Sequence, residues 1–126
     1  MSNTYQKRKA SKEYGLYNQC KKLNDDELFR LLDDHNSLKR ISSARVLQLR
    51  GGQDAVRLAI EFCSDKNYIS RDIGAFILGQ IKICKKCEDN VFNILNNMAL
   101  NDKSACVRAT AIESTAQRCK KNQIYS

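Results

Sequence analysis

Apolar residues recur every three or four positions in six stretches of the chain, the spacing that places side chains on one face of an α-helix. A weaker stretch of the same kind, with Tyr14, Tyr17 and Cys20, precedes them at residues 11–22. The six sets are Leu28, Leu31 and Leu32; Leu38, Ile41, Ala44 and Leu47; Ala55, Leu58, Ala59, Phe62 and Cys63; Ile69, Ile73, Phe76, Ile77, Gln80 and Ile81; Val91, Ile94, Leu95, Met98 and Ala99; and Ala105, Ala109, Ile112, Ala116 and Cys119. The pattern predicts an all-α protein.

Short polar connections join the predicted helices, at residues 33–36, 51–52, 65–67 and 101–103. Connections of this length make successive helices antiparallel neighbours. Residues 24–27 (Asn-Asp-Asp-Glu) form a good capping sequence for the first predicted helix. We expect a basic N-terminal segment at residues 1–22, with room for one helix, and a single repeat domain at residues 23–126, since no linker divides the latter.

An arginine recurs near the start of three predicted helices, as Arg40, Arg71 and Arg108. Small residues follow each arginine three or four positions later. The spacings are 31 and 37 residues, and the extra six correspond to an insertion at residues 84–89. The intervening helices also align, because residues 55–65 parallel residues 91–102. The chain therefore carries an internal repeat.

The repeat resembles the short HEAT-like repeat, best at Val107-Arg108 and at Arg71 with Gly74-Ala75 and Leu78-Gly79. The resemblance covers residues 23–119. It departs from the usual pattern in lacking proline and in having Ser70 and Lys39 where the repeat prefers valine. The resemblance implies an α-α superhelix of stacked antiparallel helix pairs, with first helices on the outer face and second helices on the inner one.

The chain as a whole is similar to the N-terminal part of HEAT-repeat proteins encoded beside bacterial Rhs toxin genes, notably at residues 51–54 and 83–89. This resemblance implies an immunity protein that binds the toxin domain and neutralises it. The apolar face from Ala105 to Cys119 has no following helix to complete its repeat. We therefore expect the repeat domain to be truncated at its C-terminal end; the alternative is a second subunit that covers this face.

Charge and composition narrow the class of partner. The net charge is +8, of which residues 1–22 contribute +5. This basic segment, with Tyr5, Tyr14 and Tyr17, leaves nucleic acid as an alternative partner. The second helices, however, expose a mixed set that favours a protein partner over a phosphate track: Arg57, Glu61, Asn93, Asn96 and Asn97. With no secretory signal and no apolar run of membrane-spanning length, we expect a cytoplasmic protein without membrane contact.

Three aspartates lie six residues before the three arginines: Asp34, Asp65 and Asp102. We interpret the pairs as a structural Asp–Arg ladder that ties adjacent repeats through charge-assisted hydrogen bonds. The alternative is that the three arginines contact phosphates or an acidic partner. On either interpretation the spacing marks the turns between helices.

No catalytic, metal or cofactor site is predicted. Cys84 and Cys87 form a C-x-x-C pair, but a zinc site needs more ligands than this pair and the single His35 provide, and a thioredoxin-like site needs a βαβ context. Lys85 and Lys86 would lower the pKa of the two thiols. The six cysteines are expected to be reduced, and most to pack as small hydrophobic residues. A lyase label would follow only from the repeat's likeness to bilin lyases, so we expect a binding protein rather than an enzyme.

Overall fold

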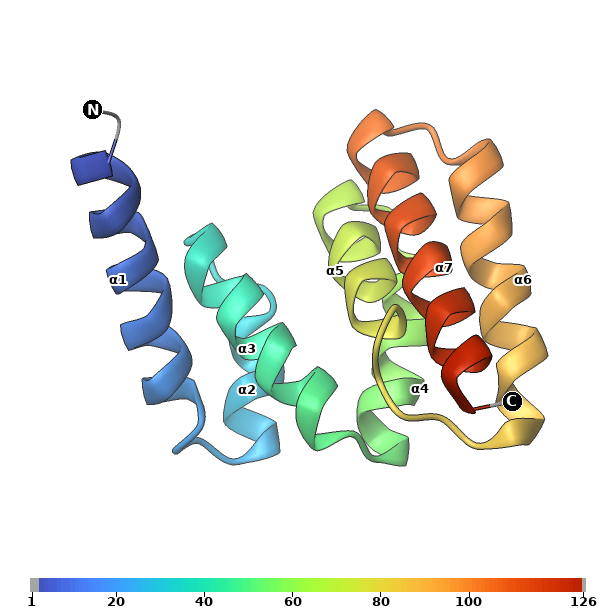
Figure 1. The fold of residues 1–126 in the computed structure, drawn as a ribbon, viewed down its shortest axis with the longest axis horizontal. Helices are drawn as coiled ribbons and strands as arrows, with labels where there is room; N and C mark the ends of the chain where they lie inside the picture. The colour runs from blue at the N-terminus through green and yellow to red at the C-terminus, as the bar shows by residue number, and fades with distance from the viewer. Residues whose placement is uncertain (1–2, 126) are drawn as a thin grey trace. The chain divides into compact units, whose positions relative to one another are not determined.

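The computed structural model describes the backbone of residues 3–125 and the side chains of residues 4 and 6–120. Within these residues the chain forms helices and no strand, which confirms the all-α prediction (Figure 1). The helices are α1 (Asn3–Cys20), α2 (Asp25–Leu31), α3 (Ser37–Arg50), α4 (Gln53–Phe62), α5 (Tyr68–Leu78), α6 (Lys85–Asn101) and α7 (Ala105–Tyr125). In the described part of the chain, no helix combines the length and the apolar character needed to cross a bilayer.

The chain divides into two compact units, Met1–Val46 and Leu47–Ser126, and the boundary between them lies inside α3. The six predicted apolar stretches correspond one each to α2 to α7, although Gln80 and Ile81 lie beyond the end of α5, and the weaker stretch corresponds to α1. Helix α1 begins at Asn3, earlier than the predicted residue 11. The division after residue 22 stays a prediction.

In the first unit, α1 is largely exposed, and Cys20 is its one buried residue among the side chains described. Helix α2 begins with the cap that the sequence predicts. The Glu27 backbone N–H donates to Asn24 Oδ1 at 2.9 Å, and the Asn24 N–H donates to Glu27 Oε1 at 3.3 Å. This reciprocal pair satisfies two backbone donors at the start of a short helix. Leu28 and Leu32 are buried behind it.

The second unit begins with the last turn of α3, which ends at two glycines with positive φ, Gly51 at 73° and Gly52 at 103°. Residues with a Cβ are strained in this region, so glycine lets the chain reverse here at little cost. The connection lies where the sequence predicts it. Just before it, the buried Gln48 side chain donates from Nε2 to the Phe76 carbonyl at 2.8 Å, which ties α3 to α5 within this unit.

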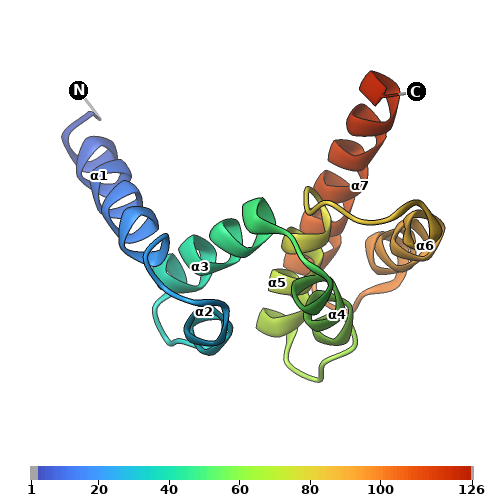
Figure 2. The same cartoon turned by 90° about the horizontal axis from the view of Figure 1, so that it is seen from below.

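Helix packing in the second unit joins α4 to α5, α6 to α7, and α5 to α7. Helices α6 and α7 run antiparallel, side by side (Figures 1 and 2). Helices α5 and α6, although consecutive, contact each other little. The short connections at residues 65–67 and 101–103 predict that α4 lies beside α5 and that α6 lies beside α7. Both pairs are observed, each across an aspartate-containing turn. The stacking of such pairs into a superhelix stays a prediction.

Two small residues set how closely these helices approach. A Cβ added at Gly74 of α5 would lie 2.6 Å from the carbonyl oxygen of Ala59 in α4. A Cβ added at Gly79 would lie 2.6 Å from Ser114 Oγ of α7. Ser114 Oγ in turn donates to the Ala75 carbonyl at 2.7 Å. The α4–α5 contact is therefore a close backbone packing, whereas at Gly79 the side chain of Ser114 occupies the space that a Cβ would take.

Helix α7 packs with a different face from the predicted one. The predicted apolar set, from Ala105 to Cys119, is exposed, and Ile112 is 59% exposed. Among the side chains of α7 that the structure describes, the buried ones are Val107, Ala111, Ser114 and Arg118. Two of these are polar, and their hydrogen bonds to α5 carbonyls stabilise them inside the unit. The prediction of the core face was wrong because it counted apolar residues alone.

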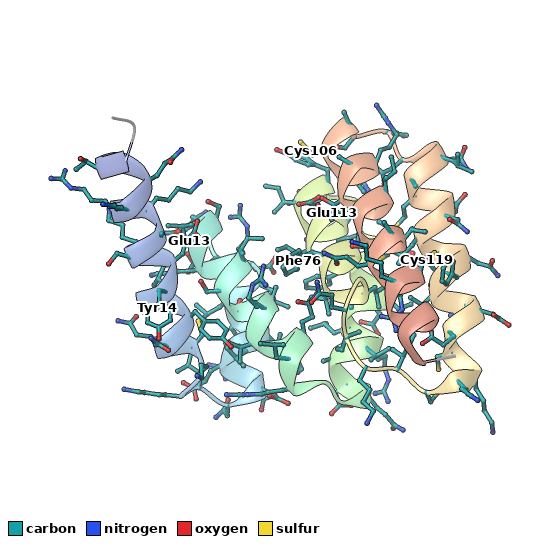
Figure 3. The ribbon with its side chains drawn as sticks, viewed as in Figure 1. Glu13, Tyr14, Phe76, Cys106, Glu113 and Cys119 are labelled. Atoms are coloured by element: carbon teal, nitrogen blue, oxygen red, sulfur yellow. The ribbon has the colours of Figure 1, made fainter. Side chains whose placement is uncertain are left out.

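The cysteines also differ from expectation. Cys20 and Cys63 are buried, and burial raises the pKa of Cys63 to about 12, with a further contribution from the charge of Asp102. Cys84, Cys106 and Cys119 are exposed, and Cys87 is half-buried. Figure 3 labels Cys106 and Cys119, which project from α7. Packing as a small hydrophobic residue therefore describes only the first two.

Candidate partner-binding surface

The same turn precedes α3, α5 and α7, with the sequence Asp-x-(Asn/Ser)-x-x-x-Arg. In the turn before α5, Arg71 Nη1 donates to the carbonyl of Asp65 at 3.1 Å. The Asp65 carboxylate accepts from the Asn67 N–H at 2.8 Å, and Asn67 Oδ1 accepts from the Ile69 N–H at 2.9 Å. The three side chains thus close the turn and cap the helix.

The other two turns repeat these bonds. The arginine-to-carbonyl bonds are Arg40 Nη1 to Asp34 at 2.7 Å and Arg108 Nη1 to Asp102 at 2.7 Å. The carboxylate bonds come from the N–H groups of Asn36 to Asp34 and of Ser104 to Asp102, both at 2.9 Å. The caps are Leu38 N–H to Asn36 Oδ1 at 2.9 Å and Val107 N–H to Ser104 Oγ at 3.4 Å. Each aspartate therefore contacts the arginine six residues later through its backbone carbonyl.

A carboxylate–guanidinium pair between successive turns is formed by Arg71 and Asp102. Arg71 Nε lies 2.9 Å from Asp102 Oδ2, and Nη2 lies 3.1 Å from Oδ1, a bidentate arrangement. The two side chains are 16% and 7% exposed. The hydrogen bond from Arg71 lowers the pKa of Asp102 and the same bond raises the pKa of Arg71. This pair is one rung of the kind that the sequence predicts.

The five predicted partner-contact residues are all exposed and all lie in the second unit. Asn93, Asn96 and Asn97 share one face of α6, because they are three and four residues apart. Arg57 and Glu61 lie on α4. Arg57 Nη1 is 3.6 Å from Asp54 Oδ1 in an exposed pair. The structure therefore places an amide-rich face on α6 and a mixed charged face on α4.

A groove of about 510 Å³ lies between the C-terminal ends of α4 and α6. Of the five predicted residues, Asn97 lines it. The other lining residues are Cys63, Lys66, Arg71, Met98, Asn101, Asp102 and Lys103. Asn101 Nδ2 donates to Asn97 Oδ1 at 2.9 Å, which orients both amides at the rim. The groove combines a buried apolar surface from Met98 with amides and two lysines, so its surroundings suit carboxylate and carbonyl groups.

Sequence reasoning missed Lys66 and Lys103, although a signal for them exists. Each lysine directly follows the aspartate of its turn, Asp65 and Asp102, so the two occupy equivalent positions. A smaller hollow of about 320 Å³ lies beside them, lined by Lys66, Tyr68, Arg71, Lys103 and Ser104. The lysines thus border both hollows at this end of the unit.

The aromatic residues of the basic N-terminal segment lie in the first unit. Tyr14 and Tyr17 line a groove of about 370 Å³ together with residues of α3, and Tyr14 is 69% exposed. The ammonium group of Lys21 lies 5.3 Å from the centre of the Tyr17 ring. The side chain of Tyr5 lies outside the described residues. Glu13 also lines this groove, and its negative charge interrupts the positive charge of the N-terminal segment.

Arg118 is a buried polar residue that the sequence pattern does not reveal. It is 2% exposed, and its Nη1 donates to the carbonyls of Leu78 at 2.8 Å and Ile81 at 2.9 Å. Its Nη2 lies 3.1 Å from Glu88 Oε1. Arg118 therefore ties α7 to the α5–α6 connection and to the first turn of α6.

Cys84 and Cys87 place two further reactive side chains within hydrogen-bond distance of each other. The side chain of His35 is exposed in the α2–α3 turn, and its carbonyl accepts from Arg40 Nη1 at 3.0 Å. Over the described residues, no group of three or more His, Cys, Asp or Glu side chains is placed to hold a metal ion.

No protein-family model matches the chain. Over all 126 residues the chain is 98% identical to protein YibA of Escherichia coli K12 and to protein YibA of E. coli O157:H7, and it covers 45% of each. An X-ray structure of E. coli YibA matches it with a TM-score of 0.87 at 98% sequence identity, over 90% of this chain and 42% of that one. The chain thus spans less than half the length of the curated relatives it matches.

Proposed function

We propose that the chain is a protein-binding helical-repeat scaffold and that it acts in the cytoplasm as part of an immunity protein for an Rhs-type toxin domain. The observation that carries the scaffold is the turn found before α3, α5 and α7, with the same three types of hydrogen bond each time. A local structure repeated at 31 and 37 residues is typical of α-α superhelices, which bind partners along their stacked helices. The toxin class follows from the resemblance to proteins of Rhs loci.

The exposed face of α6 and the adjoining groove supply the proposed contact surface. Asn93, Asn96 and Asn97 offer both donors and acceptors, and Lys66 and Lys103 add positive charge beside them. Such a surface recognises backbone carbonyls and carboxylates of a protein partner. The chain carries a net charge of +8, so its fit to the toxin rests on shape and hydrogen bonding rather than on acidic mimicry of nucleic acid.

Co-expression with the toxin domain encoded beside the gene tests this proposal. We expect the chain to restore growth of cells that express the toxin and to co-purify with it. In a double variant, Asn93→Arg with Asn97→Arg, two bulky cations replace amides at the centre of the surface. We expect this variant to bind at least about tenfold more weakly, a loss of about 1.4 kcal/mol.

A matched control makes the same change on α1, where Gln6→Arg with Gln19→Arg also adds two cations at exposed positions. This control should bind the toxin as the unmodified chain does. Failure of the unmodified chain both to rescue and to co-purify would disprove the immunity role. Tight, steeply salt-dependent binding of nucleic acid in a mobility-shift assay, without toxin binding, would favour the nucleic-acid alternative instead.

A further inference from the structure

Cys84 and Cys87 occupy the start of α6, in the six-residue insertion that interrupts the repeat. Cys84 occupies the N-cap position of the helix and has an extended backbone with φ −71° and ψ 156°. Cys87 lies in the first turn. The two Sγ atoms are 3.1 Å apart, within hydrogen-bond distance of each other. A disulfide has an S–S length of about 2.05 Å, so bond formation requires the sulfur atoms to approach by only about 1 Å.

The surroundings of the two thiols make them chemically unequal. The Cys87 thiol donates to Cys84 when Cys84 is ionised, and this lowers the pKa of Cys84; the N–H groups at the start of α6 lower it further. The same hydrogen bond raises the pKa of Cys87, since it stabilises the protonated form. The expectation that Lys85 and Lys86 lower the pKa of both thiols is therefore wrong for Cys87. Cys84 is therefore suited to attack a disulfide, and Cys87 to resolve the product.

The first turn of α6 is held in place by the rest of the unit. Glu88, next to Cys87, is paired with the buried Arg118 of α7 at 3.1 Å. Arg118 also binds the carbonyl of Ile81, three residues before Cys84, and Ile81 is fully buried. The pair of thiols is thus presented at the surface by an anchored helix end.

We propose that Cys84 and Cys87 form a thiol–disulfide exchange site for low-molecular-weight disulfides of the glutathione disulfide class. The Cys84 thiolate attacks one sulfur of the disulfide, the S–S bond of the small molecule breaks, and one small thiolate leaves. Cys87 then loses its proton to solvent and attacks the Cys84 sulfur. The Cys84–Cys87 bond forms as the second small thiolate leaves. Two protein thiols are oxidised to one disulfide, and one small disulfide is reduced to two thiols.

This site is independent of the proposed toxin binding. Its two sulfur atoms also differ from the other described cysteines. Cys20 and Cys63 are buried, and burial raises the pKa of each thiol. Cys106 and Cys119 are exposed on α7 and provide internal controls for simple accessibility (Figure 3).

Incubation of the reduced protein with glutathione disulfide at pH 7, followed by alkylation and mass spectrometry, tests the proposal. We expect the loss of two free thiols without a retained glutathione. Trypsin cleaves after Lys85 and Lys86, so the two cysteines enter separate peptides, and a disulfide between them appears as a cross-linked pair of peptides. Circular dichroism should show the same helix content before and after oxidation.

Single variants separate the two roles. Cys87→Ser should stop at a stable glutathione adduct on Cys84, whereas Cys84→Ser should leave Cys87 unmodified over the same interval. Cys106→Ser should behave as the unmodified protein does. In the Cys87→Ser variant, unfolding in urea should abolish the faster reaction of Cys84 relative to Cys106, because the helix start is lost. Adducts on Cys106 and Cys119 without the cross-linked peptides, or equal reactivity of Cys84 and Cys87 in the two single variants, would overturn the proposal.

Discussion

Asp102 stands out among the three turn aspartates because it makes two kinds of interaction at once. Its carbonyl and carboxylate close its own turn, to Arg108 and Ser104, as at the other two turns. Its carboxylate also pairs with Arg71, which comes from the preceding turn. The side chain is only 7% exposed, so both carboxylate oxygens depend on these donors rather than on water. Asp102 is therefore the aspartate whose loss disturbs two turns.

We predict that Asp102→Asn lowers the free energy of unfolding by about 1.5–3 kcal/mol, the usual value of a hydrogen bond to a charged group. Urea denaturation at neutral pH measures this. Asp54→Asn is the matched control, because Asp54 faces Arg57 in a pair whose side chains are 78% and 68% exposed. The control should change stability by less than about 0.5 kcal/mol. Equal effects of the two substitutions would contradict the assignment.

The same pair makes stability depend on pH. The pKa of Asp102 is lowered in the folded protein, first by the hydrogen bond from Arg71. The unfolded chain therefore takes up the proton first as the pH falls, and the contribution of Asp102 is lost below about pH 4. Denaturation curves recorded between pH 7 and pH 3 should show a smaller decrease in Asp102→Asn than in the unmodified protein. Parallel curves for the two proteins would rule out this linkage.

At the scale of the helices, close packing depends on Gly74. Its hydrogen atoms face the backbone of α4, where a Cβ would lie 2.6 Å from the Ala59 carbonyl oxygen and 3.0 Å from the Cys63 nitrogen. Backbone atoms cannot move aside as a flexible side chain does. Helices α4 and α5 would have to separate to admit even a methyl group.

We predict that Gly74→Ala destabilises the protein by about 1–3 kcal/mol, as overpacking of a core usually does. Gly15→Ala is the matched control, since a Cβ at Gly15 of α1 meets no atom within 4 Å. There the substitution should stabilise the helix by about 0.5–1 kcal/mol. Thermal unfolding of both variants measures the difference. A Gly74→Ala protein as stable as the unmodified one would show that α4 and α5 are less closely packed than described.

Arg118 determines how the α5–α6 connection is held. We predict that Arg118→Ala lowers stability by about 3–5 kcal/mol, because Glu88 and two backbone carbonyls lose their donor. Hydrogen exchange should accelerate most at residues 79–88. Lys120→Ala, an exposed basic residue on the same helix, should leave both measurements close to those of the unmodified protein. Uniform acceleration across the second unit would argue against a local role.

The helices themselves could be predicted from the sequence because each rests on local signals. Apolar periodicity marked α2 to α7, and the glycine pair and capping residues marked their ends. The face that α7 buries could not be predicted in this way. Ser114 and Arg118 bind carbonyls of Ala75 and Leu78, which lie 39 and 40 residues away in the sequence. A local pattern treats both residues as exposed, and only the tertiary structure supplies their partners.

Only part of the candidate surface could be predicted from the sequence. Exposure of Asn93 and Asn97 follows from the apolar face of α6, since polar residues between apolar stripes lie on the opposite side. The groove beside Asn97 could not be predicted, because it depends on how the end of α4 approaches that of α6. The difference in pKa between Cys84 and Cys87 likewise depends on the backbone at the start of α6, where Cys84 occupies the N-cap position.

At the scale of the whole molecule, burial is distributed unevenly between the two units. Helix α5 in the second unit has six buried residues out of eleven, including Ile73, Ile77 and Leu78. The described side chains of α1 are exposed or half-buried apart from Cys20. Because backbone hydrogen bonds are protected by the residues packed around them, local stability should follow this difference.

We therefore predict that amides of residues 6–15 in α1 exchange with solvent well before those of residues 73–78 in α5. Hydrogen exchange followed by mass spectrometry measures both segments in one experiment. Glycine 15 in the middle of α1 lowers its helical propensity further, so the Gly15→Ala variant should slow exchange in α1 alone. Equal protection of the two helices would contradict the link between burial and local stability in this protein.

The turn that precedes α3, α5 and α7 has a consequence for how such a chain is able to evolve. The hydrogen bonds that close the turn, from arginine to the aspartate carbonyl, join residues six positions apart. The turn therefore forms from its own short sequence wherever that sequence occurs. Gene duplication of a segment from one turn to the next would therefore copy the bonds that start the new helix together with the helix itself. Extra residues between two turns, such as those that contain Cys84 and Cys87, leave the hydrogen bonds that close each turn unchanged, because those bonds are local.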